Sequence, residues 1–497
     1  MKKVIHGGTV CDGSGNAPIR RDILIENGRI AALALPGELD KADAERIDAS
    51  GKMTVPGLID AHAHDDTRKL LFPEMRTKLL QGVTTEVDGN CGSSSSCVPG
   101  ETAGYCWNDL AGYARVLDEI GIAVNTVVLC GHNSLRYRVM GNDDRAPSAD
   151  ELEQMRGLLS SALAAGAAGW SSGLTYFPGK FAVTAELAAL AEVLRGTGKV
   201  YATHLRSEGD RLLEAVDEAA EIAAAGSGKL QISHLKTIFP QNFHKIDALL
   251  AKIDELRRSG LDVRADRYPY IHSSTSIAQT LPPPYSRMPD IGDRLRASEA
   301  FQAEVAEALK HSPRDLPTTI LLKCGRTLAE IAGSDGVTAE TACMRALTED
   351  PHQSAAYLCM SQENLERILD QPYVCAGSDN ISLPLDDPAS AGHPRSAGTF
   401  PKFFRMVAAR HGVGEAVRRM TSLPAEIFRI PERGLVRAGY VADLAILDAE
   451  NYDTRADFSG GDFMPTGVAR VLVAGHTAWS ADDPPTVRRF GRFLAVN

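Results

Sequence analysis

Short apolar runs alternate with longer segments of helical pattern through the middle of the chain. Eight such runs are present, and each ends in polar or glycine residues before a helix-like stretch begins. This alternation is typical of parallel βα units, and eight of these units close a TIM barrel. The runs lie at 57–61, 84–87, 124–129, 168–170, 200–203, 230–233, 262–265 and 373–376. We therefore predict an α/β fold built on a (β/α)8 TIM barrel.

Both ends of the chain have a β pattern instead. Near the N-terminus, apolar and polar positions alternate between turn residues, and Asn27-Gly28 between two apolar runs indicates a hairpin. The C-terminal part of the chain repeats this pattern. We predict that residues 1–55 and 421–497 together form one small β-sandwich, and that residues 56–420 form the barrel domain.

The interval between the seventh and eighth runs is much longer than the other intervals. It contains alternating helical and mixed patterns, such as the one at 293–310. A single βα unit does not need so many residues. We predict an inserted subdomain or lid at about 285–350, between strands seven and eight of the barrel.

Composition and charge narrow the class of protein. Of the 497 residues, 44% are hydrophobic and 24% are charged, which is typical of a globular protein. The net charge of −11 argues against a nucleic-acid partner, and no stretch is long and apolar enough to predict a membrane partner. The nine cysteines include no Cys-x-x-Cys pair, which argues against a disulfide framework and favours a reducing cytoplasm. The oligomeric state stays open.

Residue types that bind metals recur at the ends of the predicted strands. His62 and His64 close the first run, and the period of two along a strand turns both side chains to the same side. Cys91 follows the second run, His204 the fifth and His234 the sixth. Each alone could be structural, since a lone cysteine is more often a small buried hydrophobe. Together at one mouth of a barrel they predict a metal cluster, and this N/S ligand set favours Zn²⁺.

Charged side chains near the same strand ends suggest further roles. Asp379 follows the eighth run; alone it could form a turn, but beside a metal site it could take a proton from water and deliver it to an amide nitrogen. Lys236 and Arg395 could bind a carboxylate. We interpret Arg206 and Arg267 as members of structural ion pairs.

Several segments resemble the amidohydrolase superfamily of metal-dependent hydrolases. These are 55–64, Ser378-Asp379 and 434–444. Within that superfamily, further segments resemble the N-acyl-D-amino-acid deacylases, or D-aminoacylases, so that the resemblance covers nearly the whole chain. These further segments are 82–85, 89–92, 173–182, 268–270 and 393–401.

The element Gly89-Asn90-Cys91-Gly92 is the most discriminating of these segments. Most relatives with two metals bridge them with a carboxylated lysine from the fourth strand, and the region 168–176 of this chain contains no lysine. Cys91 is the plausible substitute for that lysine.

The resemblance implies an activity and a role for each site residue. The activity is zinc-dependent hydrolysis of the amide bond of an N-acyl-D-amino acid, and the D configuration rests on the resemblance alone. Asp379 would be the catalytic acid and base. The remaining roles are a tightly bound zinc on Cys91, His204 and His234, a second, weaker or vacant metal site on His62 and His64, and an α-carboxylate pocket of Lys236, Arg395, Tyr268 and Ser274.

The chain also departs from the family pattern. Asn380 stands where glycine is usual, Leu235 where a second histidine is common, and the segment 379–393 is longer. These positions bear on substrate specificity.

Two alternative functions stay open. One is a cyclic amide or ureide hydrolase similar to dihydroorotases and hydantoinases, against which the missing lysine argues. The other is a non-catalytic scaffold on the same fold, against which the complete ligand set argues.

Overall fold

The computed structural model describes residues 2–40, 43–382, 392–458 and 464–497. Most of the lengthened segment between Asp379 and His393 therefore lies outside the described residues.

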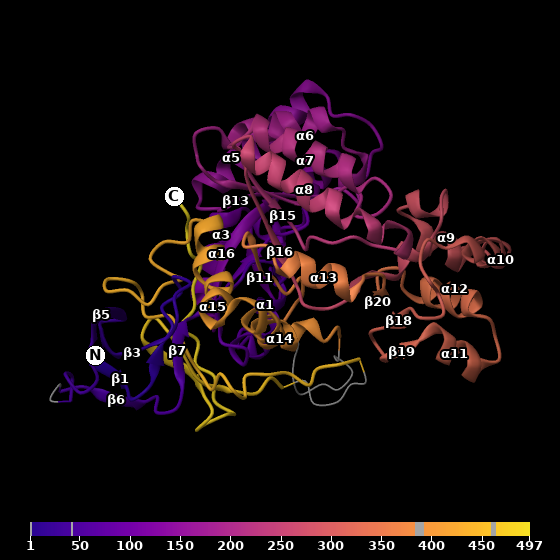
Figure 1. The fold of residues 1–497 in the computed structure, drawn as a ribbon. Helices are drawn as coiled ribbons and strands as arrows, with labels where there is room; N and C mark the ends of the chain where they lie inside the picture. The colour runs from indigo at the N-terminus through magenta and orange to yellow at the C-terminus, as the bar shows by residue number, and fades with distance from the viewer. Residues whose placement is uncertain (1, 41–42, 383–391, 459–463) are drawn as a thin grey trace.

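Eight parallel strands form the centre of the molecule (Figure 1). Their order is β21-β16-β15-β14-β13-β12-β9-β8. The two outer strands meet, because the Ala61 N–H donates to the Ala376 carbonyl at 3.2 Å. All eight predicted runs are strands of this sheet, so the (β/α)8 prediction is confirmed. The strands are β8 (Leu58–Asp60), β9 (Val83–Asp88), β12 (Asn125–Gly131), β13 (Gly169–Gly173), β14 (Val200–His204), β15 (Lys229–Ile232), β16 (Asp262–Arg267) and β21 (Val374–Ala376).

Helices cover the outer face of the barrel, so that its strands are buried on both sides. All seven residues of β12 are buried, for example, as expected for a parallel strand between helices and barrel interior. The outer helix α5 (Ala149–Ala164) begins at a capping box of Ser148 and Glu151, which satisfies its first free N–H groups. The outer helices include α3 (Leu110–Ile120), α5 (Ala149–Ala164), α6 (Thr184–Ala191), α7 (Leu212–Ala225), α8 (Ile246–Arg258), α13 (Gln362–Leu369) and α14 (Arg395–His411).

A β-sandwich from both chain ends lies beside the barrel (Figure 1). The predicted hairpin is confirmed, because β4 and β5 pair antiparallel around Asn27 and Gly28, both with positive φ. One cluster of apolar side chains joins N-terminal and C-terminal strands. The first sheet contains β1 (Lys2–His6), β4 (Asp22–Glu26), β5 (Arg29–Ala34) and β6 (Glu45–Asp48); the second contains β2 (Thr9–Val10), β3 (Ile19–Arg20), β7 (Met53–Pro56), β22 (Leu444–Leu447), β23 (Val468–Val473) and β24 (His476–Ser480).

Two stretches within the predicted sandwich range 421–497 pack against the barrel instead. Helix α16 (Ser422–Ile427) and the C-terminus join the hydrophobic cluster of the barrel interior. The Leu494 N–H donates to the Thr126 carbonyl at 2.8 Å. Because Leu494 and Val496 are apolar and buried, the chain end follows the barrel wall. The domain boundaries themselves stay a prediction.

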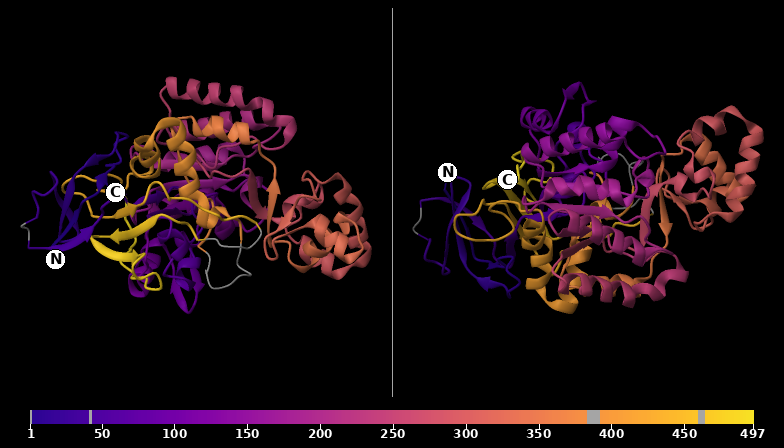
Figure 2. Two further views of the ribbon diagram at one scale, coloured as in Figure 1. Left: turned by 60° about the horizontal axis from the view of Figure 1, so that its bottom comes forward. Right: turned by 90° about the horizontal axis from the view of Figure 1, so that it is seen from above.

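An inserted subdomain lies between β16 and β21 and projects from the side of the barrel away from the sandwich (Figure 2). Its helices pack on a hydrophobic cluster separate from the barrel core. Its sheet extends beyond the predicted range of about 285–350, because β17 pairs with β20 across that range. The elements are β17 (His272–Ser276), α9 (Ile291–Ala297), α10 (Glu299–Ala308), β18 (Ile320–Leu321), β19 (Arg326–Thr327), α11 (Leu328–Asp335), α12 (Ala339–Glu349) and β20 (Ser354–Leu358).

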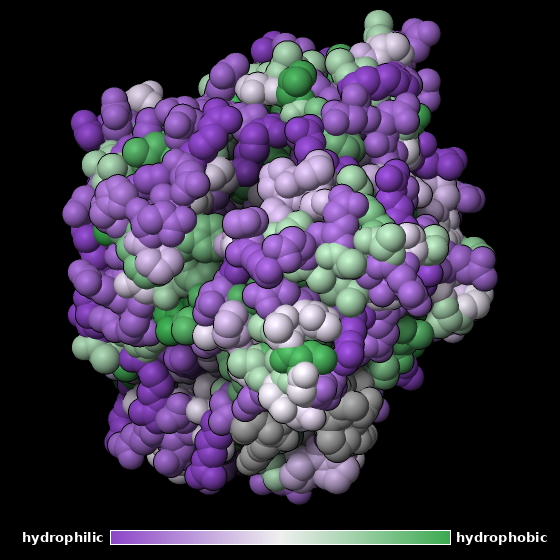
Figure 3. Space-filling model, turned by 90° about the vertical axis from the view of Figure 1, so that its right-hand side faces the viewer, coloured by the Kyte–Doolittle hydropathy of each residue, from purple (hydrophilic) through white to green (hydrophobic). Residues whose placement is uncertain are grey.

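The surface on the side of the inserted subdomain is mainly hydrophilic, with apolar residues scattered among polar ones (Figure 3). Among the described residues, none of the helices combines the length and apolar character needed to cross a membrane.

Candidate metal centre

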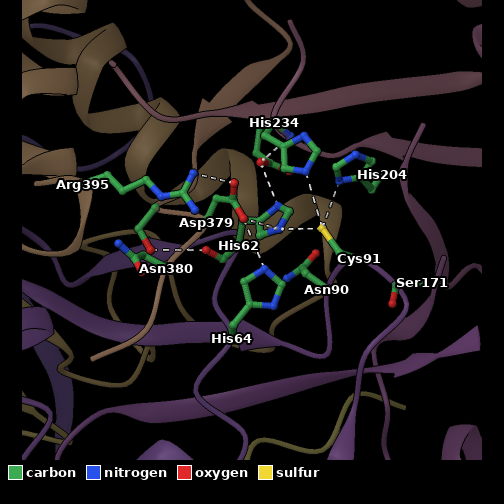
Figure 4. Close-up of polar contacts among 12 residues, drawn as sticks. His62, His64, Asn90, Cys91, Ser171, His204, His234, Asp379, Asn380 and Arg395 are labelled. Carbon is green, nitrogen blue, oxygen red and sulfur yellow. Dashed lines mark hydrogen bonds and ion pairs between the residues drawn. The ribbon is translucent and has the colours of Figure 1, made fainter. Parts of the chain in front are cut away.

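The side chains predicted to bind metal converge at the carboxyl ends of the barrel strands (Figure 4). Each of these residues ends or follows one of the parallel strands. The carboxyl ends of the strands in a parallel barrel all lie at the same mouth. His62 and His64 follow β8, Cys91 follows β9, His204 ends β14, His234 follows β15 and Asp379 follows β21.

The backbone at three of these positions is in the left-handed region. The φ angles of Cys91, His234 and Asp379 are 52°, 39° and 51°. Residues other than glycine adopt this conformation at a cost, and it is found where surrounding structure holds a side chain in a required direction. Here the left-handed conformation directs the side chains of Cys91, His234 and Asp379 toward one another.

Cys91 lies at the centre of the cluster (Figure 4). Its Sγ is 3.3 Å from His62 Nε2, 3.5 Å from His234 Nε2 and 3.8 Å from His204 Nδ1. Burial alone would raise the pKa of the Cys91 thiol, but the charges of His62 and His234 outweigh burial and hold the pKa well below its usual range. The thiolate, which is the form that binds metal, is therefore favoured.

These distances fit a zinc ion. Tetrahedral zinc with bonds of about 2.0–2.3 Å holds its N and S donors about 3.3–3.8 Å apart. The three Cys91 contacts fall in this range. In the part of the chain that the structure describes, two groups have ligand atoms within 4.8 Å of one another. They are His62, Cys91, His234 and Asp379, and His204, Glu208 and His234.

Asp379 lies on the open side of the cluster. Its Oδ1 is 3.2 Å from His64 Nε2 and 3.4 Å from His62 Nε2. Its Oδ2 accepts a hydrogen bond from Arg395 at 2.7 Å. Burial would raise the pKa of the Asp379 carboxyl, but Arg395 and the neighbouring histidines hold it well below its usual range. His64 belongs to neither group of close ligand atoms and is 28% exposed at the rim.

Two carboxylates behind the histidines were not predicted. Asp266 is the next-to-last residue of β16, and its Oδ1 is 3.0 Å from His62 Nδ1. Glu208 follows β14, and its Oε1 is 3.0 Å from His234 Nδ1. Such carboxylates orient histidine ligands in metal sites. Asp266 could have been found by the rule used for the other residues, since it directly follows the predicted run 262–265. Glu208 lies in a loop, where the sequence has no comparable signal.

The two cations predicted to bind substrate both have carboxylate partners. Lys236 Nζ lies 2.5 Å from Glu208 Oε1, and Arg395 pairs with Asp379. The Arg395 guanidinium lies 4.7 Å from the centre of the Tyr268 ring. Both cations are buried. Both cations lie beside the cluster as predicted, but each already forms an ion pair, Lys236 with Glu208 and Arg395 with Asp379.

Two adjoining cavities reach the cluster. One of about 630 Å³ is lined by His64, Cys91, Asp379 and Arg395. The other, of about 260 Å³, is lined by His204, His234, Lys236 and Tyr268. Both are also lined by Ser274 and Asp379. Because Ser274 lies on β17, the inserted subdomain forms part of the wall of each cavity.

A buried network of charges supports the strand ends below the cluster. Asp60 Oδ1 accepts from the backbone N–H groups of Ser378 and His62, at 2.8 and 3.2 Å. Asp60 Oδ2 accepts from Lys78 Nζ at 2.6 Å, and Lys78 also lies 3.5 Å from Glu86. Burial would lower the pKa of Lys78, but Asp60 and Glu86 raise it, so the ammonium stays charged. The network ties β8 to the turn that carries Asp379.

We expect Lys78→Met to lower the free energy of unfolding by about 3–5 kcal/mol, because removing one partner of a buried ion pair leaves uncompensated charge. Chemical denaturation measures the change. Lys252→Met is the control, since it removes a lysine whose partner Asp217 is on the surface, where a pair contributes about 0–1 kcal/mol. Equal losses in the two variants would contradict the assigned role of Lys78.

Two secondary predictions have different outcomes. Arg206 pairs with Glu218 at 2.8 Å, which confirms the predicted ion pair. The prediction for Arg267 is wrong, because it has no carboxylate partner among the described residues. It lies 4.2 Å from the centre of the Tyr268 ring and donates to the Tyr270 carbonyl. Its place at the buried end of β16, under an aromatic ring, accounts for the difference.

Comparisons with known proteins agree with this geometry. The model of the family described as Amidohydrolase family matches residues 45–312. The chain is 35% identical to N-acyl-D-glutamate deacylase of Alcaligenes xylosoxydans xylosoxydans over 506 residues, covering 99% of this chain and 96% of that protein.

Solved structures are similar over the same length. The crystal structure of N-acyl-D-glutamate deacylase from Bordetella bronchiseptica, complexed with zinc and a phosphonate inhibitor that mimics the tetrahedral intermediate, is 34% identical with a TM-score of 0.84 and 99% of both chains covered. A D-aminoacylase, whose binuclear metal center is described with one-metal activation and second-metal attenuation, is 31% identical with a TM-score of 0.82 and the same coverage. Likeness of this extent, from the sandwich through the barrel to the inserted subdomain, shows that the chain belongs to the amidohydrolase family, in the branch of the N-acyl-D-amino-acid deacylases.

Proposed function

We propose that this protein is a zinc-dependent hydrolase that cleaves the amide bond of N-acyl-D-amino acids, releasing a carboxylate and a free D-amino acid. The observation that carries the proposal is the arrangement of three histidine nitrogens at 3.3–3.8 Å around Cys91 Sγ, with the Asp379 carboxylate on the open side. The full-length likeness to N-acyl-D-amino-acid deacylases supports the substrate class and its configuration.

Cys91, His204 and His234 would hold the tightly bound zinc, and His62 and His64 a second metal. When bound, zinc supplies Lewis-acid chemistry, which polarises a carbonyl and makes water a better nucleophile at neutral pH. The buried thiolate and imidazoles are suitable ligands, as the distances around Cys91 indicate.

Asp379 is the residue that moves protons. Its ionised carboxylate accepts a proton from the water that attacks the acyl carbonyl carbon. The same proton then passes from Asp379 to the amide nitrogen as the C–N bond breaks, so that the amine leaves in a neutral form. Arg395 keeps Asp379 ionised before the reaction and holds Oδ2, which leaves Oδ1 to face the histidines.

The α-carboxylate of the substrate requires a cation at the site, although the protein as a whole is acidic. Lys236, Arg395, Tyr268 and Ser274 would bind it, and all four line the two cavities. Since each cation already has a carboxylate partner, the substrate would share these cations rather than neutralise free ones. Binding then fixes the substrate relative to Asp379 through Arg395.

The carboxylate pocket is tested by comparing two substrates. We expect Lys236→Met to weaken binding of an N-acetyl-D-amino acid by about 1.5–3 kcal/mol, the range for a hydrogen bond to a charged group. Arg395→Met should raise KM and also lower kcat, because the substrate is no longer oriented. The corresponding substrate with an amidated carboxylate is the control. Equal losses on both substrates would assign the two residues to structure alone.

The function itself is tested with a panel of linear and cyclic substrates. We expect free amino acid to appear from N-acetyl-D-amino acids and not from their L enantiomers, dihydroorotate or hydantoins. The fourth barrel strand, β13, has the sequence GWSSG without the lysine that cyclic-amide relatives use, which favours the linear substrates. Preferential hydrolysis of a cyclic amide would replace the proposal with the alternative.

A further inference from the structure

Glu208 contacts both halves of the site. Its Oε1 lies 3.0 Å from Nδ1 of His234 and 2.5 Å from Nζ of Lys236, and its Oε2 lies 3.7 Å from Nε2 of His204. The side chain is only 8% exposed. A single buried carboxylate therefore touches two histidines of the proposed tight zinc site and one cation of the proposed carboxylate pocket.

Two side chains lie within hydrogen-bond distance of His234 Nδ1, the ring nitrogen that faces away from Cys91. Glu208 can only accept a hydrogen bond there, whereas Lys236, at 2.6 Å from the same Nδ1, can only donate one. A neutral imidazole carries one N–H. If Nδ1 carries the hydrogen, Nε2 has a free lone pair, and if Nδ1 accepts a hydrogen bond, Nε2 carries the hydrogen. The Nε2 atom is the one that faces Cys91 Sγ, at 3.5 Å.

The two outcomes differ in their capacity to bind metal. When Nδ1–H donates to Glu208, Nε2 presents a lone pair toward Cys91 and can bind zinc. When Lys236 donates to Nδ1, Nε2 carries the hydrogen and cannot bind a metal. The second outcome also leaves the buried Glu208 carboxylate with fewer partners.

We propose that Glu208 is a positioning residue that holds His234 in its metal-binding tautomer against competition from Lys236, and so couples the zinc site to the carboxylate pocket. The inference rests on the proposed function, because it assumes that His234 binds zinc. If Glu208 were absent, we expect the Lys236 ammonium, which the substrate carboxylate needs, to donate to His234 Nδ1 and so weaken zinc binding.

Zinc affinity of the purified protein, measured by competition with a chelator of known affinity, tests the proposal. We expect Glu208→Gln to lower zinc affinity by at least about 10-fold, the lower end for loss of such a partner. Glu208→Asp keeps the carboxylate and should restore part of the affinity. Glu218→Gln removes a nearby carboxylate that pairs with Arg206 and should bind zinc like the wild type.

A double variant distinguishes control of the His234 tautomer from local unfolding around the site. If Lys236 competes for Nδ1, Glu208→Gln combined with Lys236→Met should bind zinc more tightly than Glu208→Gln alone, because the competing donor is gone. Local unfolding would instead make the double variant worse than the single one. Wild-type affinity in Glu208→Gln, or no recovery in the double variant, would overturn the proposal. Absence of zinc binding by the wild-type protein would instead refute the proposed function.

Discussion

Replacing Cys91 with alanine is expected to abolish both zinc binding and turnover. Among the described residues, Cys91 Sγ is the atom that lies within 3.8 Å of nitrogens of His62, His204 and His234, so its removal takes a ligand from the proposed tight zinc site. The loss of zinc affinity should exceed the roughly 10–100-fold that loss of an outer partner costs. Metal analysis of the purified variant, with a deacylation assay, measures both effects.

The neighbouring Cys97 offers a matched control for that variant. It is also buried, but its Sγ lies 4.0 Å from the Ser96 hydroxyl and it interacts with Cys130 rather than with the histidines of the cluster. Cys97→Ala should therefore keep its zinc and most of its activity. Full metal content and activity in Cys91→Ala would remove Cys91 from the metal site.

Replacing Asp379 with asparagine is expected to lower kcat by at least about 10²-fold while zinc remains bound. The amide keeps the shape of the side chain and can still accept the hydrogen bond from Arg395, but it cannot accept a proton from water. Steady-state kinetics and metal analysis on one preparation measure the two quantities.

Asp370→Asn controls for the general effect of removing a carboxylate, because Asp370 pairs with Arg410 at the surface. Its kcat should match that of the wild type. An unchanged kcat in Asp379→Asn would mean that another group moves the proton, and loss of zinc in that variant would mean that Asp379 acts mainly as a ligand.

The barrel and its proposed ligands could be predicted from the sequence because both depend on local pattern. Each parallel strand is a short apolar run, and the residue after it lies at the common mouth. His62, Cys91, His204 and His234 were found in this way, without knowledge of which strands are neighbours. The same rule extends to Asp266 near the end of β16.

Other features depend on contacts between distant segments, which no local pattern contains. The pairing of Lys236 with Glu208 joins loops after two different strands. The full extent of the inserted subdomain depends on a pairing between β17 and β20, in which Ser274 lies opposite Ala356. The path of the C-terminus along the barrel wall is decided in the same way, by the packing of Leu494 into a cluster assembled from several strands.

Zinc-dependent deacylation is measured by preparing metal-free protein and following the release of amino acid from an N-acetyl-D-amino acid as zinc is added back. We expect negligible release without zinc, and a rise to full activity as zinc fills the proposed site of Cys91, His204 and His234. The L enantiomer should stay uncleaved throughout. Equal rates with and without zinc, or no release at any zinc concentration, would show that the protein is not a zinc-dependent deacylase of N-acyl-D-amino acids.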